Sequence, residues 1–209
     1  MNAYILAGGK SLRFGSCKAR VEIEGIPCLV RLCAQLRSSG LAPWIVSKTR
    51  EDFADLFPPG GGNPPGMLAD KEGIDGPLAG IATALEHCDR ANQSKCWILN
   101  CDLIEWRGGW NDAVLSLAEE TQEEAYLVML TPSGNSMQDT SLRHQPFPGL
   151  YDTRSLPHLF APEVIARRSV QSWISIFANR CTWVSVPTDI APRTFNTPAQ
   201  LQEILGGTR

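Results

Sequence analysis

The sequence predicts an α/β protein in which a mostly parallel sheet is flanked by helices. Short apolar runs of strand length alternate along the chain with segments of helical periodicity, which is typical of parallel sheets with right-handed crossovers. The 209 residues suffice for a substantial core, and 43% hydrophobic with 20% charged residues is the balance of an ordinary soluble protein. We therefore expect one domain over residues 1–209.

Turn residues and the period of the apolar positions delimit the elements. Apolar runs bounded by Gly, Pro or Asn predict strands, and apolar residues three or four positions apart predict helices, several of which open on a proline. The stretch 58–66 is so rich in Pro and Gly that we expect an irregular surface loop there. In chain order, the predicted elements are a strand at 3–6, a helix at 27–37, a strand at 43–46, a helical turn at 51–56, a helix at 77–87, a strand at 96–99, an acidic solvent-facing helix at 112–120, a strand at 126–130 and a last helix opening near 198.

Charge and cysteine content argue against several classes of protein. A net charge of −3 disfavours a nucleic acid or a membrane surface as the main partner. No apolar run approaches the roughly 18 residues of a membrane span, and no charged-then-apolar leader opens the sequence. The seven cysteines are scattered without a Cys-x-x-Cys pair, so we expect buried thiols rather than a zinc site, and a cytoplasmic protein.

The most informative segment follows the first strand and reads Leu6-Ala7-Gly8-Gly9-Lys10-Ser11-Leu12-Arg13-Phe14-Gly15-Ser16-Cys17-Lys18. Its glycines lack a Cβ, so the backbone N–H groups can approach a bulky anion. Lys10, Arg13, Lys18 and Arg20 add positive charge here, although the chain as a whole is negative. The spacing fits neither a P-loop nor a dinucleotide fingerprint. It predicts a triphosphate site, in preference to a plain glycine-rich turn with solvated lysines.

Asp102 carries the second chemical signal. It follows the apolar strand 96–99, and a carboxylate at the tip of such a strand is costly unless a cation meets it. Mg²⁺ prefers one or two carboxylates together with water and phosphate oxygens. A turn or helix-capping aspartate is the alternative, but the nearby triphosphate loop favours the metal.

The ordered motifs resemble the molybdenum cofactor guanylyltransferases over nearly the whole chain. The resemblance implies a Rossmann-like sheet of the nucleotide-diphospho-sugar transferase type, with an added antiparallel portion. It also implies transfer of GMP from GTP to the phosphate of molybdopterin, with Mg²⁺ as cofactor and transient contact with cofactor-synthesis or molybdoenzyme proteins. The matching segments are Leu6–Lys18, Asp70 with Gly76-Pro77-Leu78-Ala79-Gly80, Cys101-Asp102, Gln145-Pro146 with Gly149-Leu150-Tyr151, and Asn196-Thr197-Pro198.

The resemblance also implies roles for individual residues. Asp70 would lie at the nucleoside end, and Ser47 stands where the family commonly places an asparagine that meets the nucleotide. Asn196 would lie close to the metal, although as bare sequence it is equally a helix cap. The implied nucleotide-binding residues are Leu6, Ala7, Gly8, Gly9, Ser11, Lys18, Ser47, Asp70 and Asp102, the catalytic residues are Arg13, Lys18 and Asp102, and the metal ligands are Asp102 and Asn196.

The expected chemistry is an in-line displacement, in which the acceptor phosphate attacks the α-phosphorus of the triphosphate and expels pyrophosphate. Two anions must meet, so positive charge from Lys18, Arg13 and Mg²⁺ should dominate catalysis. Arg143, Arg167 and Arg168 are candidates for binding the acceptor, with a solvated basic face as the alternative. Two other functions stay open: a nucleotidyltransferase that uses CTP or a sugar-phosphate acceptor, and a non-catalytic nucleotide-binding module.

Overall fold

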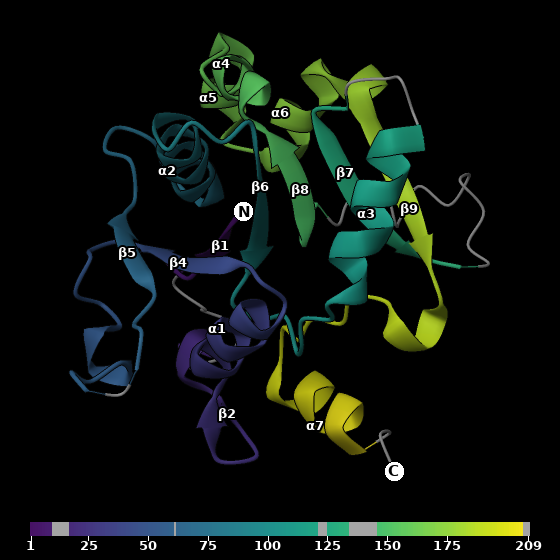
Figure 1. Cartoon of the computed structure of the whole chain (residues 1–209). Helices are drawn as coiled ribbons and strands as arrows, with labels where there is room; N and C mark the ends of the chain where they lie inside the picture. The colour runs from purple at the N-terminus through teal and green to yellow at the C-terminus, as the bar shows by residue number, and fades with distance from the viewer. Residues whose placement is uncertain (10–16, 61, 121–124, 134–145, 207–209) are drawn as a thin grey trace.

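A sheet of seven strands forms the centre of the molecule in the computed structural model, which describes residues 1–9, 17–60, 62–120, 125–133 and 146–206 (Figure 1). The strand order is β5-β4-β1-β6-β8-β7-β9, and every neighbouring pair is parallel except those made by β8. The strands are β1 (Asn2–Leu6), β4 (Ala42–Ser47), β5 (Gly66–Ala69), β6 (Lys95–Asn100), β7 (Leu127–Pro132), β8 (Gly149–Asp152) and β9 (Cys181–Val186), with a separate hairpin of β2 (Glu22–Ile23) and β3 (Ile26–Pro27).

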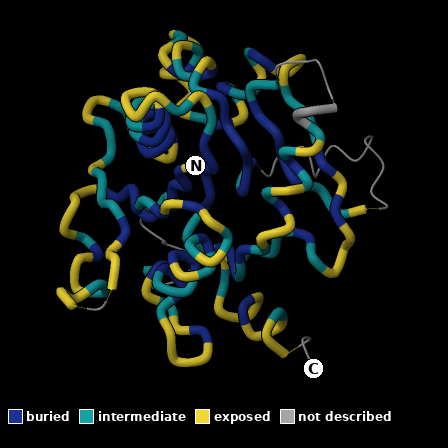
Figure 2. The backbone as a smooth tube through the Cα atoms, in the orientation of Figure 1, coloured by how far each residue is buried: buried dark blue, intermediate teal, exposed yellow. Residues whose placement is uncertain are grey.

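Helices cover both faces of this sheet, and the side chains of β1 show the two faces in alternation. Ala3 and Ile5 belong to the core beneath α1, α3 and α7, whereas Tyr4 belongs to the core beneath α2 and α4–α6. The buried segments run through the middle of the molecule and the exposed ones surround them (Figure 2). The helices are α1 (Cys28–Ser38), α2 (Pro77–Arg90), α3 (Gly109–Glu120), α4 (Leu156–Leu159), α5 (Pro162–Arg167), α6 (Val170–Ile176) and α7 (Pro198–Gly206).

Most predicted elements occur within two or three residues of their expected limits, and the parallel sheet is confirmed. The expectation of a solvent-facing helix at 112–120 was wrong in part. Helix α3 begins earlier, at Gly109, and both Trp110 and Val114 are buried in the core. Trp106 is buried as well, and its ring packs edge-on against the Trp110 ring, so these two tryptophans are packing residues.

No helix of the described residues is long and apolar enough to cross a membrane. The cysteines, all within the described residues, are unpaired, and four of them are fully buried. Burial raises the pKa of Cys28 and of Cys33 to about 12, so neither thiol ionises at neutral pH.

Candidate active site

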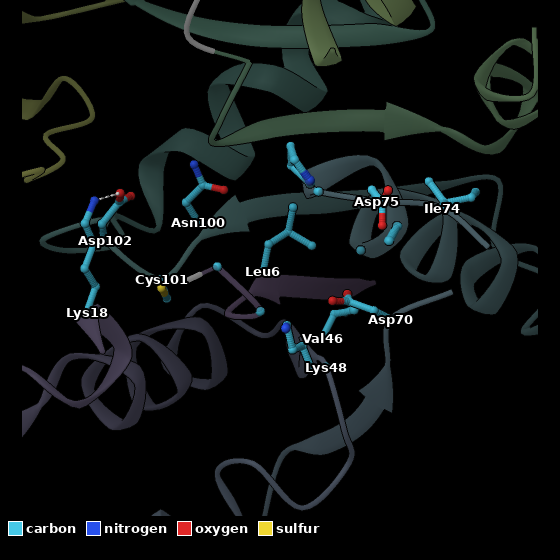
Figure 3. Close-up of a pocket in the computed structure, with 16 residues that line it drawn as sticks. Leu6, Lys18, Val46, Lys48, Asp70, Ile74, Asp75, Asn100, Cys101 and Asp102 are labelled. Carbon is cyan, nitrogen blue, oxygen red and sulfur yellow. Dashed lines mark hydrogen bonds and ion pairs between the residues drawn. The ribbon is translucent and has the colours of Figure 1, made fainter. Parts of the chain in front are cut away.

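A pocket of about 760 Å³ opens at the carboxyl edge of the sheet, above the ends of β1, β4, β5 and β6 (Figure 3). Backbone hydrogen bonds extend the sheet past the strand ends and hold this edge in place. The Ala7 N–H donates to the Val46 carbonyl (2.8 Å), and the Cys101 N–H donates to the Leu6 carbonyl (3.2 Å). Six of the residues expected from the sequence line the pocket: Leu6, Gly8, Gly9, Lys18, Asp70 and Asp102.

Three of the expected site residues meet at one end of this pocket. The Lys18 ammonium donates to Asp102 Oδ2 (2.9 Å) and to Asn196 Oδ1 (2.8 Å). The side chains of Lys18 and Asp102 are only 13% and 14% exposed, so water screens their ion pair less than it would a surface pair. A carboxylate and an amide oxygen therefore converge on a single cation.

The chain brings these residues together from three distant segments. Lys18 opens a 3-10 turn after the glycine-rich loop, and Asp102 follows β6. The segment before α7 reaches Asp102 because the Phe195 N–H donates to the Asp102 carbonyl (3.2 Å), beside a bridge between Leu103 and Thr194. Phe195 is fully buried, and this anchor fixes the position of its neighbour Asn196.

The helix-cap role that the sequence left open for Asn196 belongs to its neighbour. The Thr197 hydroxyl accepts from the Gln200 N–H (3.2 Å), and Gln200 Oε1 accepts from the Asn196 N–H (2.8 Å). These two bonds give the Asn196 and Gln200 backbone N–H groups acceptors at the start of α7, and neither bond uses the Asn196 carboxamide. Its oxygen is directed to Lys18 instead.

The second carboxylate oxygen of Asp102, Oδ1, bears on whether a metal ion fits this site. Oδ1 is buried and, within the part of the chain that the structure describes, has no hydrogen-bond partner. A buried carboxylate oxygen is costly without a donor or a cation. No group of three or more His, Cys, Asp or Glu side chains in the described ranges could form a metal cage. Asp102 and Asn196 thus offer few but hard oxygen donors, a set that fits Mg²⁺ together with water and phosphate.

Asp70 lies at the other end of the pocket, against two glycines. A Cβ on Gly8 would stand 2.6 Å from Asp70 Oδ2, and one on Gly80 would stand 3.3 Å from Asp70 Oδ1 and 3.0 Å from a Leu6 methyl carbon. The two glycines therefore make room for the carboxylate beside bare backbone. Burial raises the pKa of Asp70, and no described side chain gives it a hydrogen bond or an ion pair.

Two other expected contact residues lie beneath the pocket rather than in its lining. Ala7 is 5% exposed, and its N–H is taken by Val46. Ser47 is 2% exposed, and its hydroxyl donates to the Thr49 carbonyl (2.8 Å). The next residue, Lys48, lines the pocket instead, and no sequence signal had singled it out. Ser11, Arg13 and Arg143 lie outside the described residues.

The pocket lies at the carboxyl edge of a parallel sheet, with bare glycine backbone on one side and a cation between two oxygens on the other, which suits a nucleoside triphosphate. The chain is a nucleotidyltransferase. Residues 3–178 match the model of the MobA-like NTP transferase domain, and the chain belongs to that family.

Relatives span nearly the whole chain at modest identity. A "probable molybdenum cofactor guanylyltransferase" of Nostoc sp. is 28% identical over 208 residues, which cover 99% of this chain and 91% of that protein. The molybdopterin-guanine dinucleotide biosynthesis protein A of Archaeoglobus fulgidus superposes with a TM-score of 0.65 at 17% identity, over the full length of both chains. A putative glucose-1-phosphate thymidylyltransferase of Bacillus anthracis reaches 0.68 at 13% identity, covering 100% of this chain and 95% of that one. At these identities the two structures show a shared fold.

Proposed function

We propose that this protein transfers GMP from GTP to the phosphate of molybdopterin, releasing pyrophosphate and forming molybdopterin guanine dinucleotide. The observation that carries the proposal is the convergence of Lys18, Asp102 and Asn196 at one end of a pocket that holds Asp70 at the other. The names of relatives that span the chain support the choice of nucleotide and acceptor. Residues 1–209 would act as one domain, since both cores pack on one sheet.

The pocket residues would bind GTP along its length. Asp70 would receive the nucleoside, and the glycine backbone at Gly8 and Gly9 would pass beneath the phosphates. Lys18 would donate to phosphate oxygens, and Arg13 would add a second cation. With the acceptor phosphate held in line, these charges would lower the repulsion between two anions.

Asp102 and Asn196 would hold Mg²⁺, and Asp102 Oδ1, which has no hydrogen-bond partner among the described residues, supports this proposal. When bound there, the metal would neutralise charge on the phosphates and the departing pyrophosphate. No residue need act as a base, since a phosphate monoester is already mostly ionised at neutral pH. Asp102 would then help to position the phosphates. The Lys18 ammonium would exchange its hydrogen bonds with Asp102 and Asn196 for hydrogen bonds with phosphate oxygens.

The test measures pyrophosphate release from each of the four triphosphates, with and without purified molybdopterin. We expect release from GTP that requires molybdopterin and Mg²⁺, with the dinucleotide identified by mass. Lys18→Ala should lower turnover on the order of 10²-fold, as for loss of one preorganised charge. Release with CTP, or with a sugar phosphate in place of molybdopterin, would replace the proposal by the related transferase. Nucleotide binding without any release would leave a binding module.

A further inference from the structure

The residue after Ser47 occupies the nucleoside end of the pocket. Ser47 itself is unsuited to a ligand because it is buried and its hydroxyl is used by Thr49. Lys48 is exposed, lines the pocket and lies beside Asp70, away from the Lys18–Asp102 pair (Figure 3). A Cβ on Gly8 would have both Asp70 Oδ2 and the Lys48 backbone nitrogen within 4 Å, so the two residues border the same bare backbone.

The other charged groups near this end already have partners, including Asp52, whose carboxylate accepts from the Thr49 N–H (3.0 Å) and the Thr49 hydroxyl (2.8 Å). Asp75 lines the pocket too, but it forms an ion pair with Arg168 (2.5 Å). Lys71, next to Asp70 in the chain, pairs with Glu86. In the described part of the chain, the Lys48 ammonium has no carboxylate within ion-pair distance, and the Asp70 side chain has no donor.

Lys48 and Asp70 therefore present complementary groups to one ligand. An ammonium only donates hydrogen bonds, and an ionised carboxylate only accepts them. Burial and the negative charge of Asp52 raise the pKa of Asp70, and the positive charge of Lys48 opposes them in favour of the accepting carboxylate. A nucleobase that binds to this pair needs a hydrogen-bond acceptor opposite Lys48 and adjacent hydrogen-bond donors opposite Asp70.

Guanine has that pattern. Its O6 is an acceptor, and its N1–H and 2-amino group are adjacent donors that a carboxylate can receive together. Adenine and cytosine present an amino donor where guanine has O6, and uracil presents a second acceptor where guanine has its amino group. Each of the other three bases would place at least one like group against the pair, which is costly in a half-buried site.

We propose that Lys48 is a specificity-determining residue that donates to O6 of guanine while Asp70 accepts from N1–H and the 2-amino group. The inference rests on the proposed function, with GTP as the nucleotide, and it names the contacts that select the base. The family resemblance places a nucleotide-contacting side chain at position 47. In this chain the neighbouring residue, Lys48, would make that contact in place of Ser47.

The test compares nucleotide affinities without acceptor, by titration near pH 7. The probes are GTP, 6-thio-GTP, which has a poor acceptor at position 6, and ITP, which lacks the 2-amino group. Lys48→Met should weaken GTP binding on the order of tenfold or more and abolish the preference of GTP over 6-thio-GTP, while the preference over ITP persists. Asp70→Asn should do the reverse, losing the preference over ITP. Lys48→Arg, which keeps a donor, should retain the preference over 6-thio-GTP.

Lys71→Met is the matched control, since it removes the same charge one residue from Asp70 but outside the pocket. It should leave all three affinities within about twofold. If Lys48→Met weakens every triphosphate equally, Lys48 serves the phosphates and the inference fails. An unchanged ratio of GTP to 6-thio-GTP affinity in Lys48→Met also overturns it. Tighter binding of CTP than GTP by the unaltered protein would instead refute the proposed function.

Discussion

The Asp102 and Asp70 carboxylates lie at the two ends of the pocket in different electrostatic environments. At one end a carboxylate and an amide share an ammonium, and one buried carboxylate oxygen has no donor in the described structure. At the other end the half-buried Asp70 carboxylate has no hydrogen-bond or ion-pair partner among the described residues. Both arrangements cost stability in the protein alone, and a nucleotide with its metal would relieve them. Residue-scale substitutions can therefore separate binding from folding.

Asp102→Asn should abolish magnesium-dependent GTP binding while leaving the fold intact. An asparagine can still accept from Lys18, and its amide no longer buries an unpartnered anionic oxygen. Lys18 keeps amide-oxygen acceptors but loses the opposite charge, so the free energy of unfolding should fall by about 1–3 kcal/mol, less than for a fully buried ion pair. Thermal denaturation and GTP titrations with and without Mg²⁺ on this one variant provide the measurement. A variant that keeps its magnesium dependence would rule out Asp102 as a metal ligand.

Asp70→Asn should raise stability at neutral pH and lose that advantage in acid. Burial raises the pKa of Asp70 in the folded state above its unfolded value, so the folded protein holds the proton more tightly. Ionised Asp70 therefore costs stability at neutral pH. The cost shrinks as pH falls through the raised pKa and disappears below the ordinary aspartate value of about 3.8.

Urea denaturation of the Asp70→Asn protein at several pH values between neutral and acid would measure this difference. Asp55→Asn is the matched control, because the pKa of Asp55 is lowered by its hydrogen bond with Arg20. That variant should lose stability at neutral pH, opposite in sign to Asp70→Asn. Equal behaviour of the two variants would contradict an unpartnered Asp70.

At the scale of secondary-structure elements, sequence patterns located the strands with apolar runs and missed those without one. Ile5, Val46 and Ile98 belong to runs that predict β1, β4 and β6 correctly. Strand β5 was not predicted: its first residue, Gly66, was the last of the predicted loop 58–66, and glycine is rare inside strands. The structure supplies the reason, since a Cβ on Gly66 would come within 2.1 Å of the Trp44 ring. Cross-strand packing, which local sequence does not record, selects glycine there.

Gly66→Ala should therefore destabilise the protein by about 1–3 kcal/mol, as overpacking does. The Trp44 ring cannot yield easily, because it packs against His87 with ring centroids 4.0 Å apart. Gly109→Ala is the matched control, since a Cβ there meets nothing within 4 Å and its φ is not positive. It should be neutral or slightly stabilising at the start of α3. Chemical denaturation of both variants measures the difference, and equal stabilities would show that Trp44 moves aside.

At the scale of the whole molecule, the site depends on the order of the strands in the sheet and on the path of the last segment. The periodicity of apolar residues in the sequence does not reveal either. The parallel arrangement predicts that the ends of β1 and β6 meet, which places Gly8 and Asp102 in one pocket. It does not predict that β8 inserts between β6 and β7, or that the last segment returns to set Asn196 beside Lys18. Those contacts follow from tertiary packing, such as the burial of Phe195.

Ligand binding should stabilise the whole chain, because the pocket draws on β1, β4, β5, β6 and the start of α2 together. We expect GTP with Mg²⁺ to raise the melting temperature more than ATP, CTP or UTP at equal concentration, by mass action on the folded state. At about a hundredfold excess over Kd, the gain in free energy of unfolding is about 2.7 kcal/mol, which is several degrees for a chain of this size. Asp102→Asn controls for metal effects unrelated to the site, and its response to GTP should not depend on Mg²⁺. A larger rise with CTP would assign this protein to a cytidylyl branch of the same fold, because mass action ranks the ligands by their affinity for the folded state alone.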